Sequence, residues 1–581
     1  MKVLGINTGL GASICLLEDG GVRFAIEDER LTRVKNGGGF PSAALAYALE
    51  HHGDFMRALD AIGICDLEDQ AMTMPEMLDR FHRRFREDDR PAWRKALGEI
   101  RAAVGGVVPE GVKRGLRPAP TPLDLVKMVR KALPELDLPD SLFHRLKHHD
   151  CHAAAAYHGL ARDDDRPYLV LTLDGGGDRE CASVSIGRAG RLERISSTES
   201  GATIGGLYSA LTYLLGFKPH EHEYKIMGLA PYTPDRYGDG VYKILSGYIG
   251  LGGDRGLEFV RRIPEKLGNA GLRYSRDLRF TRFDNIAVGL QRFTEDLVCQ
   301  WVANAIKATG VSDVLLSGGV FMNIKMNKRI AEMAEVSSVD VFPSCGDESN
   351  AFGIAFHIEA EHGGRPRLDS YCTGPGPDYD LAEARVRYAG RLSFETVADP
   401  AATIARLLAD GHVVARCAGP MEFGARALGN RSLLADPTVP RVVERINHLI
   451  KQRDFWMPFA PAVLAEDVRD YVTVPPSLPP RISPYMMFGF ETHEDRRPAM
   501  AAALHRADQT ARVQAVDAEG YPGFHKVISA FKAITGRSVV LNTSYNLHGS
   551  PIVMGTVDAI EVMLASDLDY LMVEDTLITR V

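Results

Sequence analysis

The pattern of apolar and polar residues along the chain predicts strands that alternate with helices. Residues 2–8 and 12–30 alternate apolar with polar positions, carry β-branched side chains and are broken by glycines, which indicates a strand, a turn and a further strand. Residues 167–178 form an apolar run that ends in a glycine turn, and residues 312–334 are typical of a strand, a glycine turn and a helix. Because strands and helices alternate from there to residue 356, we expect an α/β fold.

A stretch rich in glycine, proline and polar residues, 359–380, separates this pattern from a second one. Beyond it, residues 399–411 are predicted to form a helix and residues 538–546 a strand, within an α/β pattern of their own. A chain of 581 residues is also too long for one compact core. We therefore expect two domains, residues 1–365 and residues 366–581.

Composition and charge are those of an ordinary soluble enzyme. Hydrophobic residues make up 45% and charged residues 25% of the chain, which argues against a disordered or collagen-like protein. The net charge of -8 argues against binding to nucleic acid, and no apolar stretch is long enough to span a membrane or resembles a secretion signal. The eight cysteines are scattered singly, as expected for reduced thiols. We expect a cytoplasmic protein that binds small molecules, with a homodimer as one assembly to test.

Two histidines and two aspartates form a candidate metal site. His148 and His152 lie four residues apart in a predicted helix, so their side chains share one face. Taken alone, this spacing fits a helix cap or core hydrogen bonds as well as two ligands of one metal. Asp174 and Asp347 strengthen the metal interpretation, because each lies in a glycine-containing turn after a strand, where carboxylates can converge on one ion. His149 is expected to point to another face of the helix.

Two glycine turns follow apolar strands in the first domain, at residues 174–178 and 317–323. An ordinary tight turn is the simpler interpretation of either one alone. The second turn opens a helix, however, whose backbone N–H groups can meet a phosphate. Two such turns in one domain favour a nucleotide clamp of the actin and sugar-kinase type, with Gly175, Gly176, Gly318 and Gly319.

Cationic side chains gather in the second domain. Arg426 and Arg431 flank a glycine-containing turn, and guanidinium groups stay charged and bind phosphate or carboxylate through two hydrogen bonds. Each cation alone would more often be a surface charge. Together they predict an anion pocket with amide and hydroxyl donors, whose further members are Lys451, Arg453, Arg512, Asn542, Ser544 and Asn546.

Motifs in the same order along nearly the whole chain resemble those of the O-carbamoyltransferases of nodulation-factor, cephamycin and aminoglycoside biosynthesis. They are EDERLTRVKNGGGFP, HHDCHAAAAY, LDGGGD, EYKIMGLAPY, LSGGVFMN, GDESNAFGIA, EFGARALGNRS, KQRDFWMPFAP, QTARVQ and LNTSYN. The resemblance implies an N-terminal domain like the tRNA threonylcarbamoyl transferases (TsaD-like), on the actin and sugar-kinase (ASKHA) fold. It also implies a C-terminal YrdC-like α/β domain, as in proteins that form carbamoyladenylates.

The same resemblance implies a two-step reaction. Carbamoyl phosphate and ATP, with Mg²⁺, would form carbamoyladenylate in the second domain, held by Arg426, Lys451, Arg512 and Ser544, and also by Arg431, Arg453, Asn542 and Asn546. The carbamoyl group would then pass inside the protein to a hydroxyl of a sugar or secondary metabolite. For that transfer the resemblance implies a divalent metal, Fe²⁺ in some relatives, on His148, His152, Asp347 and Asp174.

Further positions match those that line the family's transfer site. The catalytic residues implied by the match are Lys35, Glu223 and Lys225, beside His148 and Asp174. The nucleotide loop implied by the match contains Gly318, Gly319 and Asn323.

The chain departs from the family at two places. Leu10 and Gly11 stand where relatives commonly have His-Asp before Ala-Ser, so the base that deprotonates the acceptor has no assigned residue. Met457 stands where arginine is common, which removes one anion contact. The motifs do not name the acceptor, and we expect residues 72–146, with the charged, helix-prone stretch 80–101, to vary with it.

Two other functions fit part of the sequence. The N-terminal glycine turns alone allow an actin-fold kinase or ATPase, but such an enzyme has no use for the C-terminal motifs. A tRNA-modifying carbamoyl transferase fits the kinship of both domains with tRNA-modification proteins, although the acidic net charge argues against it.

Overall fold

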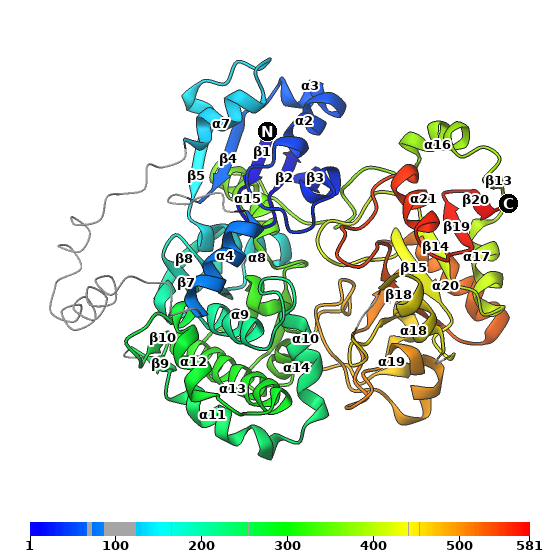
Figure 1. Cartoon of the computed structure of the whole chain (residues 1–581). Helices are drawn as coiled ribbons and strands as arrows, with labels where there is room; N and C mark the ends of the chain where they lie inside the picture. The colour runs from blue at the N-terminus through cyan, green and yellow to red at the C-terminus, as the bar shows by residue number, and fades with distance from the viewer. Residues whose placement is uncertain (67–72, 86–123, 164, 254, 440, 452–453) are drawn as a thin grey trace.

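A computed structural model of the chain describes residues 1–66, 73–85, 124–163, 165–253, 255–439, 441–451 and 454–581. Much of the region that we expect to vary with the acceptor lies outside these residues, and the predicted charged helix is described only as far as Phe85. The described residues form an N-terminal part, blue to green in Figure 1, and a C-terminal part that ends in red.

Two five-stranded sheets with the same strand order build the N-terminal part. The first contains, in order, β3 (Gly21–Glu27), β2 (Ser13–Glu18), β1 (Lys2–Asn7), β4 (Ala61–Cys65) and β5 (Phe143–Leu146). The second contains, in matching order, β8 (Arg191–Glu199), β7 (Glu180–Arg188), β6 (Tyr168–Gly177), β11 (Asp313–Ser317) and β12 (Ser338–Val341). In each sheet the first three strands are antiparallel and the last two run parallel to the third. This repeated topology gives the expected mixed α/β fold. The likeness of the N-terminal part to the actin and sugar-kinase type stays a prediction.

Helices α8 (His148–Leu160) and α15 (Asn350–Glu361) pack against each other between the two sheets. Small residues make this close contact, namely the buried alanines 153–156 on α8 and Gly353 on α15. A Cβ atom at Gly353 would lie only 2.0 Å from the carbonyl oxygen of Cys151. The alanine-rich sequence after the histidines therefore lets α15 approach α8, and this packing fixes the position of the first turn of α8.

The other N-terminal elements surround these layers. The helices are α1 (Glu29–Thr32), α2 (Ser42–His51), α3 (Gly53–Met56), α4 (Met74–Phe85), α7 (Leu125–Ala132), α9 (Ile204–Leu214), α10 (Glu223–Leu229), α11 (Asp239–Ser246), α12 (Gly271–Asp277), α13 (Phe283–Thr309) and α14 (Ile324–Ala331). A separate two-stranded sheet contains β9 (Ile249–Gly252) and β10 (Glu258–Arg261).

One mixed sheet of eight strands builds the C-terminal part. Its order is β13 (Leu392–Thr396), β20 (Thr576–Arg580), β19 (Tyr570–Val573), β14 (Val414–Cys417), β15 (Arg431–Ala435), β18 (Val539–Ser544), β16 (Ala460–Leu464) and β17 (Gln514–Val516). The helices are α16 (Leu381–Arg387), α17 (Pro400–Ala409), α18 (Arg441–Ile446), α19 (Val468–Tyr471), α20 (Pro522–Thr535) and α21 (Thr556–Leu564). The domain boundary predicted at residue 365 lies in the connection from α15 to α16. The likeness of this part to YrdC proteins stays a prediction.

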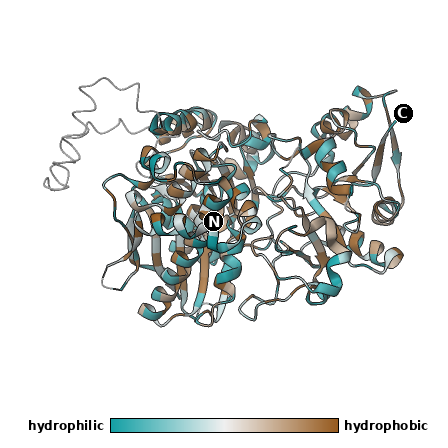
Figure 2. Cartoon of the chain, turned by 60° about the horizontal axis from the view of Figure 1, so that its bottom comes forward, coloured by the Kyte–Doolittle hydropathy of each residue, from teal (hydrophilic) through white to brown (hydrophobic). Residues whose placement is uncertain are grey.

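Apolar side chains gather inside both parts. Strands of all three large sheets contribute fully buried residues, such as Ile6, Leu171 and Leu433, and the outer helices show both brown and teal stretches in Figure 2, as expected for helices with one buried face. Within the described residues, no helix is both long and apolar enough to cross a membrane.

A buried ion pair joins the two parts. Arg30 Nη2 lies 2.9 Å from Glu27 Oε1, and both side chains are almost fully buried. Glu27 Oε1 also accepts a hydrogen bond of 2.8 Å from the backbone N–H of Gly424, and Arg30 donates to the Gly424 carbonyl at 2.5 Å. Two N-terminal residues thus hold the C-terminal loop that carries Arg426.

Candidate functional site

Four side chains from separate segments converge at the start of α8. His148 Nε2 lies 3.1 Å from His152 Nε2, 3.4 Å from a carboxylate oxygen of Asp347 and 3.5 Å from one of Asp174. All four ligand atoms lie within 4.8 Å of one another. The structure therefore brings together the four residues that the sequence analysis selected, and their nitrogen and oxygen atoms suit one divalent cation.

Neighbouring groups orient the two histidine rings toward a common centre. Asp66 Oδ1 lies 3.0 Å from Nδ1 of His148, and Ser317 Oγ lies 3.3 Å from Nδ1 of His152. A carboxylate at Nδ1 keeps the proton on that nitrogen, which leaves Nε2 of His148 with the lone pair that a metal needs. His149 lies apart from the cluster, as expected, with Nδ1 2.7 Å from the hydroxyl of Thr172.

The charges of the cluster require a cation among the carboxylates. Burial opposes protonation of His148, but Asp347 and Asp66 raise the pKa of this imidazole well above its usual value. Burial alone would raise the pKa of Asp174, yet the hydrogen bond with His148 and the charge of His152 hold that pKa well below its ordinary range. In the metal-free protein, the positive charge of a protonated His148 offsets the negative charge of these carboxylates. A divalent metal can replace that proton.

Asp66→Asn should weaken metal binding by about 10- to 100-fold, because the amide no longer fixes the His148 ring with Nε2 free. Elemental analysis of protein purified and dialysed under identical conditions measures this loss. Asp54→Asn is the matched control, since the Asp54 side chain is fully exposed. Equal metal content in the two variants would contradict the role given to Asp66.

The two predicted glycine turns meet at Asp174. Its Oδ1 accepts a hydrogen bond of 2.8 Å from the N–H of Gly319, and its Oδ2 accepts one of 3.3 Å from the N–H of Gly176. Gly318 has φ +106°, and a Cβ atom there would lie 2.3 Å from the carbonyl oxygen of Leu173, so this turn needs glycine. These glycines position a carboxylate of the His/Asp cluster, while their contact with a nucleotide stays a prediction.

Asn323 caps the helix that follows the second turn. Its side-chain oxygen accepts a hydrogen bond of 3.1 Å from the N–H of Met326, and its amide exchanges hydrogen bonds of 2.9 Å with Gln291. Asn323 lines the large cavity described below, as do Gly175, Gly176 and Gly319.

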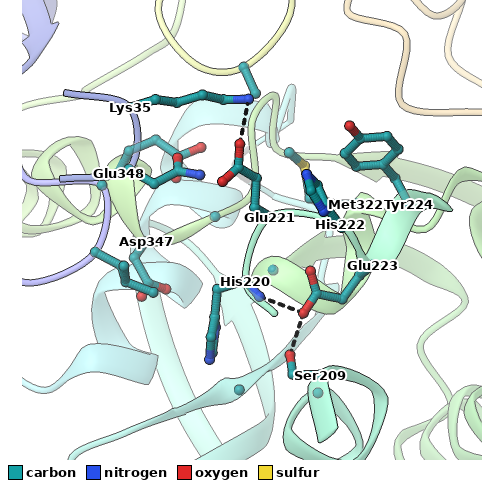
Figure 3. Close-up of a pocket in the computed structure, with 18 of the residues that line it drawn as sticks. Lys35, Ser209, His220, Glu221, His222, Glu223, Tyr224, Met322, Asp347 and Glu348 are labelled. Atoms are coloured by element: carbon teal, nitrogen blue, oxygen red, sulfur yellow. Dashed lines mark hydrogen bonds and ion pairs between the residues drawn. The ribbon is translucent and has the colours of Figure 1, made fainter. Parts of the chain in front are cut away.

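Two of the predicted transfer residues lie in charged pairs. Lys35 Nζ is 2.9 Å from a carboxylate oxygen of Glu221 (Figure 3). Lys225 Nζ is 3.0 Å from a carboxylate oxygen of Asp454. Burial alone would raise the pKa of Glu221, but Lys35 and Lys218 lower it to about 2. Each of the two predicted lysines therefore has a carboxylate partner in this structure.

Glu223 fixes the loop before α10. Its Oε1 accepts hydrogen bonds of 2.6 Å from the Ser209 hydroxyl and of 2.7 Å from the backbone N–H of His220 (Figure 3). The carboxylate lines the cavity, but its hydrogen bonds give it a positioning role in this structure.

The C-terminal cluster centres on Lys451. Its Nζ donates hydrogen bonds of 3.0 Å to Ser544 Oγ and 2.6 Å to Asn546 Oδ1. Asn542 donates through its amide to the carbonyl of Ala427 at 3.1 Å. The predicted residues that line the cavity together here are Arg426, Lys451, Arg512, Asn542, Ser544 and Asn546.

Arg431 lies away from this group. It is fully buried, and its guanidinium donates to the backbone carbonyls of Met554, Gly419, Asn430 and Pro375. Its placement gives it a structural role in the loop instead of the predicted contact with an anion. Arg453, the other predicted cation, lies outside the described residues.

One cavity of about 2400 Å³ connects the two clusters. Its walls include His148, Asp174 and Asp347 on the N-terminal side and Arg426 and Lys451 on the C-terminal side. Met457, Leu10 and Gly11, where the chain departs from the resembled family, line the same cavity. The cationic residues and the His/Asp cluster therefore line one continuous space.

Some site residues carried only a weak sequence signal. Asp66 directly follows the apolar strand β4, as Asp174 lies at the end of β6, and that parallel was the available clue. Glu422 had no such clue, although its Oε1 accepts hydrogen bonds from the N–H groups of Leu428, Asn430 and Arg431 and so shapes the C-terminal loop.

The chain is similar to several known proteins. The nodulation protein NolNO of Sinorhizobium fredii is 30% identical over 579 residues, which cover 98% of this chain and 79% of that protein. The 3'-hydroxymethylcephem-O-carbamoyltransferase of Amycolatopsis lactamdurans is 32% identical over 281 residues, 46% of this chain and 48% of that enzyme. Among solved structures, HypF in its phosphate- and nucleotide-bound form has 13% identity and a TM-score of 0.38, and covers 63% of this chain and 47% of its own. A TM-score of that size carries no argument.

Family models match both parts of the chain. The model of the carbamoyltransferase N-terminus matches residues 2–356, and that of the carbamoyltransferase C-terminus matches residues 405–580. The first match alone covers more than half of the chain, and the order of the two agrees with the order of the two parts described above. The protein belongs to the carbamoyltransferase family.

Proposed function

We propose that the protein is an ATP-dependent O-carbamoyltransferase that works in two steps. It forms carbamoyladenylate, phosphate and pyrophosphate from carbamoyl phosphate, ATP and one water, and then transfers the carbamoyl group to a hydroxyl of a sugar or secondary metabolite. The observation that carries this proposal is the single cavity that joins a cationic cluster to a buried His/Asp cluster in a carbamoyltransferase chain. One relative is a 3'-hydroxymethylcephem-O-carbamoyltransferase, which supports a hydroxyl acceptor.

The first step takes place at the C-terminal cluster in this proposal. Carbamoyl phosphate and Mg-ATP together bring several phosphate charges into a small space, and phosphate and pyrophosphate must leave as anions. Arg426, Lys451 and Arg512 line the wall there and can offset those charges. Ser544 and Asn546, which already hold Lys451, can fix the position of its ammonium group. A YrdC-like fold of this part belongs to the same proposal.

The second step takes place at the His/Asp cluster. His148, His152, Asp174 and Asp347 would hold a divalent metal, with Fe²⁺ the first to test. When bound, such an ion supplies Lewis-acid polarisation of the carbamoyl carbonyl. Lys35 lies in an ion pair on the same cavity wall and can attract the AMP phosphate of the intermediate. The acceptor hydroxyl then attacks the carbamoyl carbon, and AMP leaves.

Mass spectrometry of a small-molecule extract tests the proposal. Extract from the cells that make the protein is incubated with enzyme, ATP and ¹³C-carbamoyl phosphate, and one product should appear that is heavier by a labelled carbamoyl group. Omission of ATP should abolish it. A label that enters tRNA, added in a parallel reaction, would instead support the tRNA-modifying alternative.

A further inference from the structure

Carbamoyl transfer to a hydroxyl leaves a proton that some group must accept. The acceptor oxygen forms a bond to the carbamoyl carbon, and the bond between that carbon and the phosphate oxygen breaks. AMP takes the electron pair of the broken bond, and a base at the cavity wall can accept the hydroxyl proton as the new bond forms.

Positions 10 and 11 provide no such base. Leu10 is apolar and packs against the core of the N-terminal part. Gly11 has φ +62°, and a Cβ atom there would lie 2.9 Å from both the Cβ and the backbone nitrogen of Glu348. The backbone at this place therefore excludes an acidic side chain, and the base must come from another segment.

Several other ionisable groups of this half of the cavity already have partners. Lys35 and Lys225 are each paired with a carboxylate. Glu223 accepts two hydrogen bonds at one oxygen. His222 Nδ1 accepts a hydrogen bond of 3.2 Å from the N–H of Lys218, so the proton of the neutral ring lies on Nε2 and this ring is a donor.

His220 differs from these groups. It lines the cavity, and in the described part of the chain neither of its ring nitrogens has a hydrogen-bond partner. Phe81 packs against the ring edge-to-face at 5.4 Å between centroids. Figure 3 shows the imidazole extending from its loop on the opposite side from Glu221.

The backbone of His220 is held in an unusual conformation. Its φ of +62° lies in the left-handed region, which few residues other than glycine adopt. The hydrogen bond from its N–H to Glu223, which Ser209 in turn fixes, holds the residue there. The position of the ring at the cavity wall is therefore fixed by its own backbone and by Glu223.

We propose that His220 is the general base of the transfer step, with Glu223 as its positioning residue. This proposal rests on the proposed O-carbamoyl transfer. A neutral imidazole nitrogen takes the hydroxyl proton while the new C–O bond forms, and the imidazolium later releases it to solvent. No metal ligand has to act as a base in this scheme.

His220→Gly is the variant that tests this role, because glycine suits the left-handed backbone and removes only the imidazole. We expect it to fold and to melt close to the wild-type temperature. Phe280→Gly is the matched control, since Phe280 also has a left-handed φ, +64°, and its side chain is 94% exposed and outside the cavity wall.

Each variant of the full chain receives ATP, ¹³C-carbamoyl phosphate and either the small-molecule extract or hydroxylamine. Transfer to the extract's hydroxyl acceptor should fall about 100-fold in His220→Gly. Formation of hydroxyurea should stay within about threefold of wild type, since the nitrogen of hydroxylamine attacks through its free lone pair. Added imidazole should restore part of the lost transfer in His220→Gly and have no effect on wild type.

Three results would overturn the assignment: undiminished transfer to the extract acceptor, an equal loss with hydroxylamine, or no rescue by imidazole. Release of pyrophosphate from ATP, dependent on carbamoyl phosphate, is followed in every reaction. If wild type releases pyrophosphate but labels nothing in the extract, O-carbamoyl transfer itself is refuted, which is distinct from a failure confined to His220.

Discussion

Replacing His152 with alanine should lower carbamoyl transfer by about 1000-fold and leave the carbamoyl-phosphate-dependent release of pyrophosphate from ATP unchanged. The imidazole lies in the His/Asp cluster, 3.5 Å from Asp347, and a metal held there contributes several kcal/mol only when the acceptor attacks. Pyrophosphate release, labelled product and bound metal are measured on the same preparation. The metal content should fall with the transfer rate.

Arg512→Ala should show the opposite behaviour. Arg512 lines the C-terminal wall of the cavity, where it can hold an anionic group during adenylate formation, so pyrophosphate release should fall by about 100-fold. Synthetic carbamoyladenylate should restore product formation in Arg512→Ala and leave His152→Ala inactive. Loss of pyrophosphate release in a well-folded His152→Ala protein would refute this division of labour.

Glu27→Ala should destabilise the protein by about 3 kcal/mol, since it leaves the buried Arg30 guanidinium without its main partner. It should also slow pyrophosphate release at least about tenfold, although Glu27 lies in the N-terminal part. The reason is the lost hydrogen bond to the N–H of Gly424, two residues before Arg426 in the C-terminal loop. Urea unfolding and the pyrophosphate assay, both at low temperature, measure the two effects.

Glu29→Ala is the control for this prediction. Glu29 lies 3.2 Å from the same guanidinium and is more exposed, and in the described part of the chain it is Glu27 that accepts the hydrogen bond from Gly424. Stability should therefore fall less in Glu29→Ala, and pyrophosphate release should persist. If Glu27→Ala loses stability but keeps the wild-type rate of pyrophosphate release, the ion pair serves folding alone.

Local sequence patterns were enough to select those candidate site residues whose positions depend on helix spacing or on the ends of strands. His148 and His152 share a helix face by spacing alone, and Asp174 and Asp347 each follow a strand in a glycine turn. Helical periodicity and the position of strand ends are local properties, so these four ligands could be selected before the structure was known.

Contacts between distant segments could not be predicted in this way. Arg431 resembles an anion ligand in sequence, but backbone carbonyls from several loops surround its guanidinium and keep it from the cavity. The sequence did not point to His220. The role that we propose for this residue rests on its left-handed backbone and on the position of its ring at the cavity wall. Burial and hydrogen-bond partners of this kind arise only from the tertiary fold.

The size of the cavity has a consequence for the fate of a reactive intermediate. One molecule confined to the cavity's ≈ 2400 Å³ has a local concentration of about 0.7 M. In the proposed two-step reaction, this concentration is that of carbamoyladenylate between its two sites. At such a concentration, the His/Asp cluster would be occupied by the proposed intermediate even with a very low affinity for it. The residues of that cluster can therefore be selected for a fast reaction and not for tight binding.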